Sequence, residues 1–166
     1  MHGGNLDTRS LTIGSTVLFP VHVRGALLSL GDVHAGQGEG EVCGTGIEVA
    51  AAVTVRLTVL KRATSVLAAG VTEWQLLAPG RWSPARLLAP SRDGARHITT
   101  GFSADVKTAA GKAVWFMTDV LMAQKPGMSR EQAYMVCSLA CDLRISQLVD
   151  YPHYSVAAHL PVGVLA

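Results

Sequence analysis

The stretch from Ile47 to Val59 alternates in polarity over a greater length than any other part of the chain. The odd-numbered positions carry only apolar side chains, namely Ile47, Val49, Ala51, Val53, Val55, Leu57 and Val59. The even-numbered positions include Glu48, Thr54, Arg56 and Thr58. Because side chains alternate between the two faces of an extended backbone, this pattern predicts a β-strand with one buried face. The strand would exceed the usual length, which leaves room for a bulge.

Further strands are predicted elsewhere in the first hundred residues. Residues 16–23 alternate in polarity, and Gly25 separates them from a second extended run over 26–30. Residues 73–77 and 96–100 also suit short strands. The segment 35–46 is dense in glycine, which predicts a loop whose backbone takes unusual dihedral angles or approaches another group closely.

Two helices are predicted after residue 100. Apolar residues recur at helical spacing over 106–121, and Ser103 is the predicted N-cap of this first helix. Ser129 and Gln132 form a capping-box pattern that opens a second helix extending to about Asp142.

The order of these elements predicts an α+β fold. In this prediction a β-rich, barrel- or sandwich-like N-terminal part is followed by the helix pair and by a closing strand over 154–160. We assign residues 1–100 to a β-rich portion that carries the candidate site, and residues 101–166 to a helical α/β C-terminal portion. Both are expected to belong to a longer architecture.

Composition narrows the classes of function. The chain has 166 residues, of which 49% are hydrophobic and 16% charged, so most of it is expected to fold rather than to be disordered. Its formal net charge of +2, without a basic cluster, argues against a nucleic-acid partner. No apolar run is long enough for a membrane span, and three cysteines are too few for a disulfide framework. We therefore expect a cytoplasmic protein whose weakly charged surface is covered by another subunit or by a missing part of the protein.

Asp32 and His34 are the first candidates for chemistry. Residues i and i+2 of an extended backbone point to the same side, so the pair presents a carboxylate and an imidazole together. Zinc takes both ligand types, which makes a divalent metal, with zinc favoured, the expected cofactor. An exposed turn explains the same pair without any metal. Further ligands would come from His2, Asp7, Glu39, Glu41 or Glu48.

Two other polar residues have more than one interpretation. Glu48 begins a strand of small and apolar residues, so its carboxylate is either buried with a functional role or simply exposed at the strand end. Cys43 lies in the glycine-rich segment and is an alternative nucleophile beside His34, although no third orienting residue is evident.

Taken in order, several segments of the chain resemble the acetamidase/formamidase family, and its acetamidase branch in particular. They are His2-Gly3-Gly4-Asn5-Leu6-Asp7, Val17-Leu18-Phe19-Pro20-Val21, Gly25 to His34, Gln37-Gly38-Glu39-Gly40-Glu41-Val42-Cys43-Gly44, Ile47-Glu48, Ser129 to Tyr134 and Asp142 to Gln147. Each segment alone is a weak signal, but the ordered set is specific and spans nearly the whole chain.

The resemblance implies metal-dependent hydrolysis of small aliphatic amides, such as formamide or acetamide, to ammonia and a carboxylate. It also implies a homo-oligomer. The positions that match the family's site are Asn5, Asp7, Asp32, His34, Glu39 and Glu41. We assign Asp32, His34 and Asp7 as metal ligands. The family usually has Gly-Asp-Gly-Glu where this chain has Gly-Glu-Gly-Glu, which shifts the carboxylate of Glu39 by about one methylene.

In the mechanism that we expect, one of Glu39, Glu41 and Glu48 transfers protons as a base and then an acid. Asn5, Gly38 and Gly40 are expected to contact the substrate, with backbone amides of the glycine loop supporting the developing oxyanion.

The start of the chain suggests an alternative function. Family members are longer, and the His2-Gly3-Gly4-Asn5 motif lies well inside them, whereas here it follows Met1 directly. The alternative is a truncated, non-catalytic structural or assembly fragment that needs a missing N-terminal portion as its partner.

Overall fold

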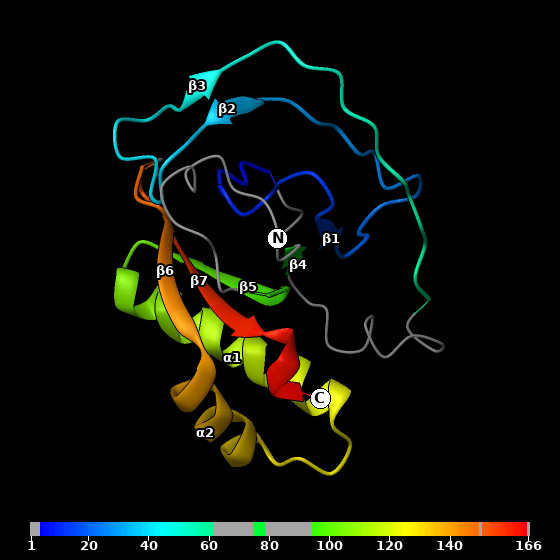
Figure 1. Ribbon diagram of the computed structural model, residues 1–166, viewed down its shortest axis with the longest axis vertical. Helices are drawn as coiled ribbons and strands as arrows, with labels where there is room; N and C mark the ends of the chain where they lie inside the picture. The colour runs from blue at the N-terminus through cyan, green and yellow to red at the C-terminus, as the bar shows by residue number, and fades with distance from the viewer. Residues whose placement is uncertain (1–3, 62–74, 79–93, 150, 166) are drawn as a thin grey trace.

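The computed structural model describes residues 4–61, 75–78, 94–149 and 151–165 (Figure 1). In chain order the elements are β1 (Thr16–Leu18), β2 (His34–Gly36), β3 (Ile47–Glu48), β4 (Gln75–Ala78), β5 (Arg96–Ser103), α1 (Val106–Gln124), α2 (Arg130–Ala140), β6 (Asp142–Gln147), β7 (Tyr154–Pro161) and a closing 3-10 turn (Val162–Leu165). The paired strands form a five-stranded antiparallel sheet in the order β1-β4-β5-β7-β6 and a two-stranded sheet of β2 and β3. This arrangement confirms the predicted α+β class, and the described residues form no closed barrel.

The long strand predicted over 47–59 is largely absent. Only Ile47 and Glu48 pair, with Gly36 and His34 of β2, and the residues from Val49 to Lys61 have no assigned strand. Side chains at both the odd and the even positions of this stretch are exposed. Val53 is 54% exposed and Leu57 is 72% exposed. An alternating pattern gives a strand an apolar face, but it does not provide the second strand with which that strand must pair. Among the described residues, no strand pairs with this stretch beyond Glu48.

Hydrogen bonds at the helix ends explain where the helices begin. Asp105, not Ser103, caps α1: its Oδ2 accepts from the backbone N–H of Thr108 at 2.7 Å. The capping box at Ser129 is confirmed, because the Ser129 side chain accepts from Gln132 N–H and the Gln132 side chain accepts from Ser129 N–H.

The second helix ends at Ala140, and the residues after it form β6 rather than a helical end. Asp142 and Arg144 point to different partners: Asp142 pairs with Arg96 at 3.2 Å, and Arg144 lies 3.6 Å from Glu39. The sequence pattern had not predicted this strand.

The larger core lies between the helices and one face of the sheet. Figure 1 shows α1 and α2 together on this side. The buried members of this core are Ala113, Met117, Val120, Leu121, Ala133, Cys137, Ala158 and Leu160. Thr99 of β5 donates to the backbone carbonyl of Ala113 at 2.7 Å, and Gly101 packs directly against the same part of α1. The sheet and α1 therefore approach each other unusually closely.

The opposite face of the sheet carries the N-terminal segment. Ile98 and Ala157 are buried there, with Leu6, Val17 and Phe19 packed against them. The two-stranded sheet lies beyond this segment, on the side of the molecule away from the helices (Figure 1).

The glycine-rich loop is joined to the large sheet by main-chain hydrogen bonds. Gly40 N–H donates to the carbonyl of Ser146 at 3.2 Å, and the Gly40 carbonyl accepts from Leu148 N–H at 2.9 Å. These bonds form a parallel bridge between Gly40 and Gln147, at the end of the outermost strand β6. The outermost strand of the large sheet thereby sets the position of the loop.

Arg130, at the first position of α2, connects the two helices. Its guanidinium donates to Thr118 Oγ1 and to Asp119 Oδ1, both at 2.7 Å, and lies 4.0 Å from the centre of the Trp115 ring. We expect Arg130→Met to lower the free energy of unfolding by about 1–3 kcal/mol, because the substitution removes charge-assisted hydrogen bonds and a cation–π contact from a partly exposed group. Urea denaturation measures the change.

Arg24→Met is the control for this prediction, because it removes an arginine from an exposed turn. Equal stability of the two variants would contradict the role given to Arg130.

Among the described residues, no helix combines the length and the apolar character needed to cross a membrane.

Candidate metal centre

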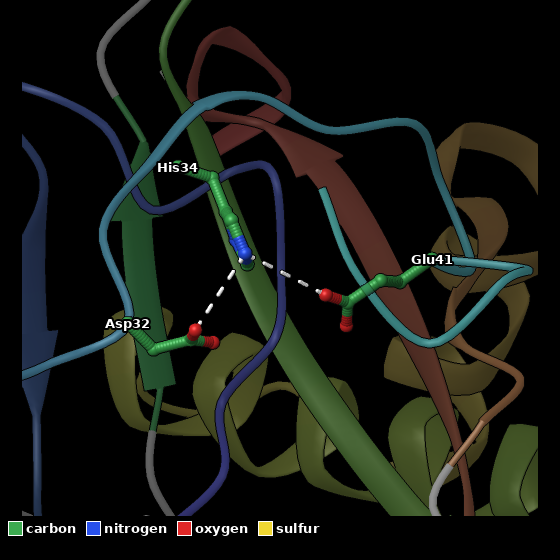
Figure 2. A group of neighbouring side chains, drawn as sticks. All are labelled: Asp32, His34 and Glu41. Carbon is green, nitrogen blue, oxygen red and sulfur yellow. Dashed lines mark ion pairs between the residues drawn. The ribbon is translucent and has the colours of Figure 1, made fainter. Parts of the chain in front are cut away.

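Asp32, His34 and Glu41 converge in the region between the two sheets. His34 Nε2 lies 3.6 Å from Asp32 Oδ1 and 3.9 Å from Glu41 Oε1. Figure 2 shows both carboxylates pointing toward the same side of the imidazole. One ligand atom from each residue lies within 4.8 Å of the others, and the group spans exposed Asp32 and buried Glu41. We call these three residues the carboxylate–histidine cluster.

The local backbone explains how residues from a short segment converge. His34 is the first residue of β2 and pairs with Glu48 of β3, which fixes the backbone that carries the imidazole. Asp32 and Glu41 both have positive φ angles, 57° and 47°, and Gly40 has φ 87°. The left-handed region is unfavourable for a residue with a β-carbon, and such conformations concentrate at functional sites.

The orientation of the His34 ring follows from its neighbours. Nδ1 lies 3.0 Å from Gln37 Oε1, so Nε2 is the ring nitrogen that faces the two carboxylates. A weak contact of 3.4 Å from Gly46 N–H also reaches Nε2. The side chain of His34 is only 8% exposed.

The cluster fits a divalent cation in donor type and in spacing. Imidazole nitrogen and carboxylate oxygen are both zinc ligands, and two ligands at tetrahedral angles lie about 3.4 Å apart. The distances of 3.6 and 3.9 Å from His34 Nε2 are close to this separation. Two carboxylates beside a ring nitrogen also need a positive charge, from a cation or from a proton, to offset their repulsion.

Glu39 lies apart from the cluster, between two arginines. Its Oε1 is 3.8 Å from Arg9 Nε and 3.6 Å from Arg144 Nη1, distances that make ion pairs rather than hydrogen bonds. Both carboxylate oxygens are buried, and no hydrogen-bond donor among the described residues reaches them. Burial raises the pKa of Glu39, and the two arginines oppose that increase.

Asp7, predicted as a metal ligand, is not part of the cluster. Its Oδ2 accepts from Gln147 Nε2 at 3.0 Å, and its backbone carbonyl accepts from Gln37 Nε2 at 2.9 Å. Glu41, predicted as a proton-transfer residue, takes the third position of the cluster instead.

The predicted substrate contacts have different surroundings. Asn5 is exposed, with φ 56°, and Gly38 is exposed with open space around the position of a Cβ. Gly40 is buried, and its N–H donates to Ser146.

Glu48 and Cys43 both lie on exposed backbone. Glu48 Oε1 accepts from Thr45 Oγ1 at 3.1 Å, while Cys43 Sγ contacts the Thr45 carbonyl at 3.4 Å. Of the two interpretations of Glu48, the structure favours the exposed strand end, and neither residue belongs to the carboxylate–histidine cluster.

Sequence reasoning missed three polar residues around the site: Gln37, Arg144 and Gln147. Gln37 lies three residues after His34, and Gln147 lies three residues after Arg144. The sequence signal for each was therefore a polar residue at a short spacing from another polar residue. The contacts across long sequence separations, such as Gln147 with Asp7, leave no local signal.

Comparison with known proteins gives a consistent result. The sequence model of the acetamidase/formamidase family matches residues 1–166. The chain is 33% identical over 177 residues to a putative formamidase of Schizosaccharomyces pombe and 32% identical over 176 residues to a formamidase of Methylophilus methylotrophus. Each alignment covers 98% of this chain but only 40% of the relative.

A solved structure is also similar. The acetamidase from Bacillus halodurans superposes with a TM-score of 0.67 at 27% identity, over 98% of this chain and 47% of that one. The chain therefore spans less than half the length of each of these three proteins.

Proposed function

This chain belongs to the acetamidase/formamidase family, and we propose that it contributes to the hydrolysis of small linear aliphatic amides, of the formamide and acetamide type, to ammonia and a carboxylate. The support comes from the names of its relatives together with one observation of its own, the convergence of Asp32, His34 and Glu41.

We propose that these three side chains hold a divalent cation, with zinc favoured by the mixture of one nitrogen and two oxygen donors. When bound, such a cation polarises a carbonyl oxygen and makes a water more acidic. Asp7 is proposed to support the cluster from outside, since its carboxylate is engaged with Gln147.

Amide hydrolysis also needs a proton carrier. A water oxygen forms a bond to the carbonyl carbon, the carbon–nitrogen bond breaks, and the proton lost by water reaches the departing nitrogen as ammonia leaves. We propose Glu39 for this transfer, because its two oxygens are buried without a hydrogen-bond donor among the described residues. Glu48 is exposed and bonded to Thr45, while Glu41 lies in the cluster.

The substrate contacts remain part of the proposal. Asn5 and Gly38 are exposed and are proposed to meet the amide. Gly40 is proposed to act through the backbone that it fixes, because its N–H already donates to Ser146.

Ammonia release from formamide and acetamide tests the proposal, with elemental analysis of the purified protein. We expect stoichiometric zinc or another divalent metal, loss of ammonia release after treatment with a chelator, and recovery on adding Zn²⁺ back. Ammonia release that is unchanged in verified metal-free protein would contradict the metal centre while leaving the amidase activity in place.

The assembly function is a second candidate, favoured by two observations. The chain covers 40% of each formamidase that it matches, and many large apolar side chains between Val49 and Leu60 are exposed. In this alternative the chain associates with a second copy or with the remaining portion of the family architecture. It predicts no ammonia release from this chain alone, and activity once the remaining portion is supplied.

A further inference from the structure

The side-chain amide of Gln37 lies between the backbone of Asp7 and the ring of His34. Gln37 Nε2 donates to the Asp7 carbonyl oxygen at 2.9 Å, and Gln37 Oε1 lies 3.0 Å from His34 Nδ1. Both contacts are partly buried. The first joins segments that are far apart in the sequence, because Asp7 and Gln37 are separated by 30 residues, whereas His34 and Gln37 are only three residues apart.

The first contact fixes the orientation of the amide. A backbone carbonyl can only accept a hydrogen bond, so the NH₂ group of Gln37 must face Asp7. The reverse orientation would place two oxygen atoms against each other at 2.9 Å. The amide oxygen therefore faces His34.

The second contact then fixes the tautomer of the imidazole. Because Gln37 Oε1 is an acceptor, His34 Nδ1 must carry the hydrogen, and a neutral ring then has its lone pair on Nε2. Nε2 lies 3.6 Å from Asp32 Oδ1 and 3.9 Å from Glu41 Oε1. It also accepts a long hydrogen bond of 3.4 Å from Gly46 N–H, which agrees with a lone pair on this nitrogen. This is the tautomer in which a histidine can bind a cation through Nε2.

We infer that Gln37 is a positioning residue, which selects the His34 tautomer that offers Nε2 to a divalent cation in the carboxylate–histidine cluster. The inference rests on the proposed metal centre. It also gives Asp7 a role other than that of a ligand, since the Asp7 backbone provides the acceptor that orients Gln37.

The large sheet provides the fixed point for this chain of contacts. Gln147, at the end of β6 and 4% exposed, donates from Nε2 to Asp7 Oδ2 at 3.0 Å. The hydrogen bonds thus continue from β6 through Asp7 and Gln37 to His34, and the buried end of this outermost strand sets the orientation of a ring in the site.

Gln37→Met tests the inference, because methionine has a similar length and neither donates nor accepts a strong hydrogen bond. We expect the ¹⁵N chemical shifts of His34, measured in metal-free protein at mildly alkaline pH, to show Nδ1–H in the wild type and a loss of this preference in the variant. Titration with Zn²⁺ alone is expected to show an affinity lower by about 10- to 100-fold, the usual effect of removing a partner of a metal-binding histidine.

Two further variants separate the role from a general loss of structure. Gln37→Glu keeps an oxygen acceptor for Nδ1–H and is expected to keep the tautomer, with a smaller loss of Zn²⁺ affinity than Gln37→Met. Gln124→Met is the matched control, because Gln124 Nε2 lies 3.4 Å from Nε2 of another histidine, His97, on the helical side of the sheet. We expect this control to leave the shifts of His34 and the Zn²⁺ affinity unchanged.

The outcomes are distinguishable from those that test the proposed function. Wild-type protein with Nε2–H, or a Gln37→Met variant that keeps the wild-type tautomer and affinity, would overturn the inference. A tautomer that depends on Gln37 in a protein that takes up no Zn²⁺ supports the role of Gln37 and contradicts the metal centre instead.

Discussion

His34→Ala is expected to abolish stoichiometric uptake of Zn²⁺ and to reduce amide hydrolysis by on the order of a thousandfold in protein that shows the activity. The imidazole is the nitrogen donor of the carboxylate–histidine cluster, and it lies within 4 Å of both carboxylates. Its removal leaves the two carboxylates of the cluster without the imidazole, so a bound cation would have one ligand fewer. Equilibrium dialysis with Zn²⁺ and an ammonia assay measure the two effects.

The matched control for this variant is His153→Ala, because His153 is exposed directly before β7. Both variants remove one imidazole, so an unspecific effect of losing a histidine would appear in each. We expect only His34→Ala to lose metal. Retention of full zinc content and activity by His34→Ala would remove both the centre and its proposed chemistry.

Gly101→Ala is expected to have the largest effect on stability. A Cβ at this position would overlap the Ala109 carbonyl oxygen and would lie 2.7 Å from Ala113 N, both of which are backbone atoms of α1. Because backbone cannot rotate aside as a side chain does, α1 would have to move away from β5. We expect the free energy of unfolding to fall by about 3 kcal/mol or more, the upper range for overpacking in a core. This is a large part of the stability of a typical domain.

Gly111→Ala provides the control for this substitution, since it is the same chemical change in α1, the helix against which Gly101 of β5 packs. Gly111 lies within α1, is exposed, and has nothing within 4 Å of the position of its Cβ. We expect this variant to be more stable than the wild type by up to about 1 kcal/mol, because alanine favours a helix over glycine. If thermal denaturation ranked the two variants in the opposite order, the close packing of β5 on α1 would be refuted.

The parts of the fold set by local interactions could be predicted from the sequence. The capping box of Ser129 and Gln132 involves neighbouring residues, so its pattern was sufficient to place the start of α2. The cap of α1 was misplaced because Ser103 and Asp105 are both suitable residues, and the geometry of β5 decides between them. The alternation after Ile47 failed as a predictor because strand pairing depends on a second segment.

In the candidate site too, local spacing predicted some of the neighbours, whereas contacts between distant segments determined the others. Asp32 and His34 lie together, as their i, i+2 spacing predicted, but Asp32 has φ 57° and is not in the extended backbone on which that prediction rested. Glu41 joins them only because the chain reverses through the glycine-rich loop, whose path is fixed by hydrogen bonds to Ser146 and Leu148. The spacing of Asp7 resembled that of a ligand equally well, but its carboxylate is engaged by Gln147. Contacts between distant segments therefore decided which acidic residues meet.

The bridge between Gly40 and the end of β6 also bears on how the protein avoids unwanted assembly. An outermost strand presents unsatisfied main-chain groups that can recruit a strand from a neighbouring molecule. Here Gly40 occupies the carbonyl of Ser146 and the N–H of Leu148, so the loop that leads into the site also shields that end of the sheet margin. Detachment of the loop would separate the residues of the cluster and, in the same event, expose unpaired main-chain groups at the edge of the sheet. Loss of the site and a tendency to aggregate would then occur together.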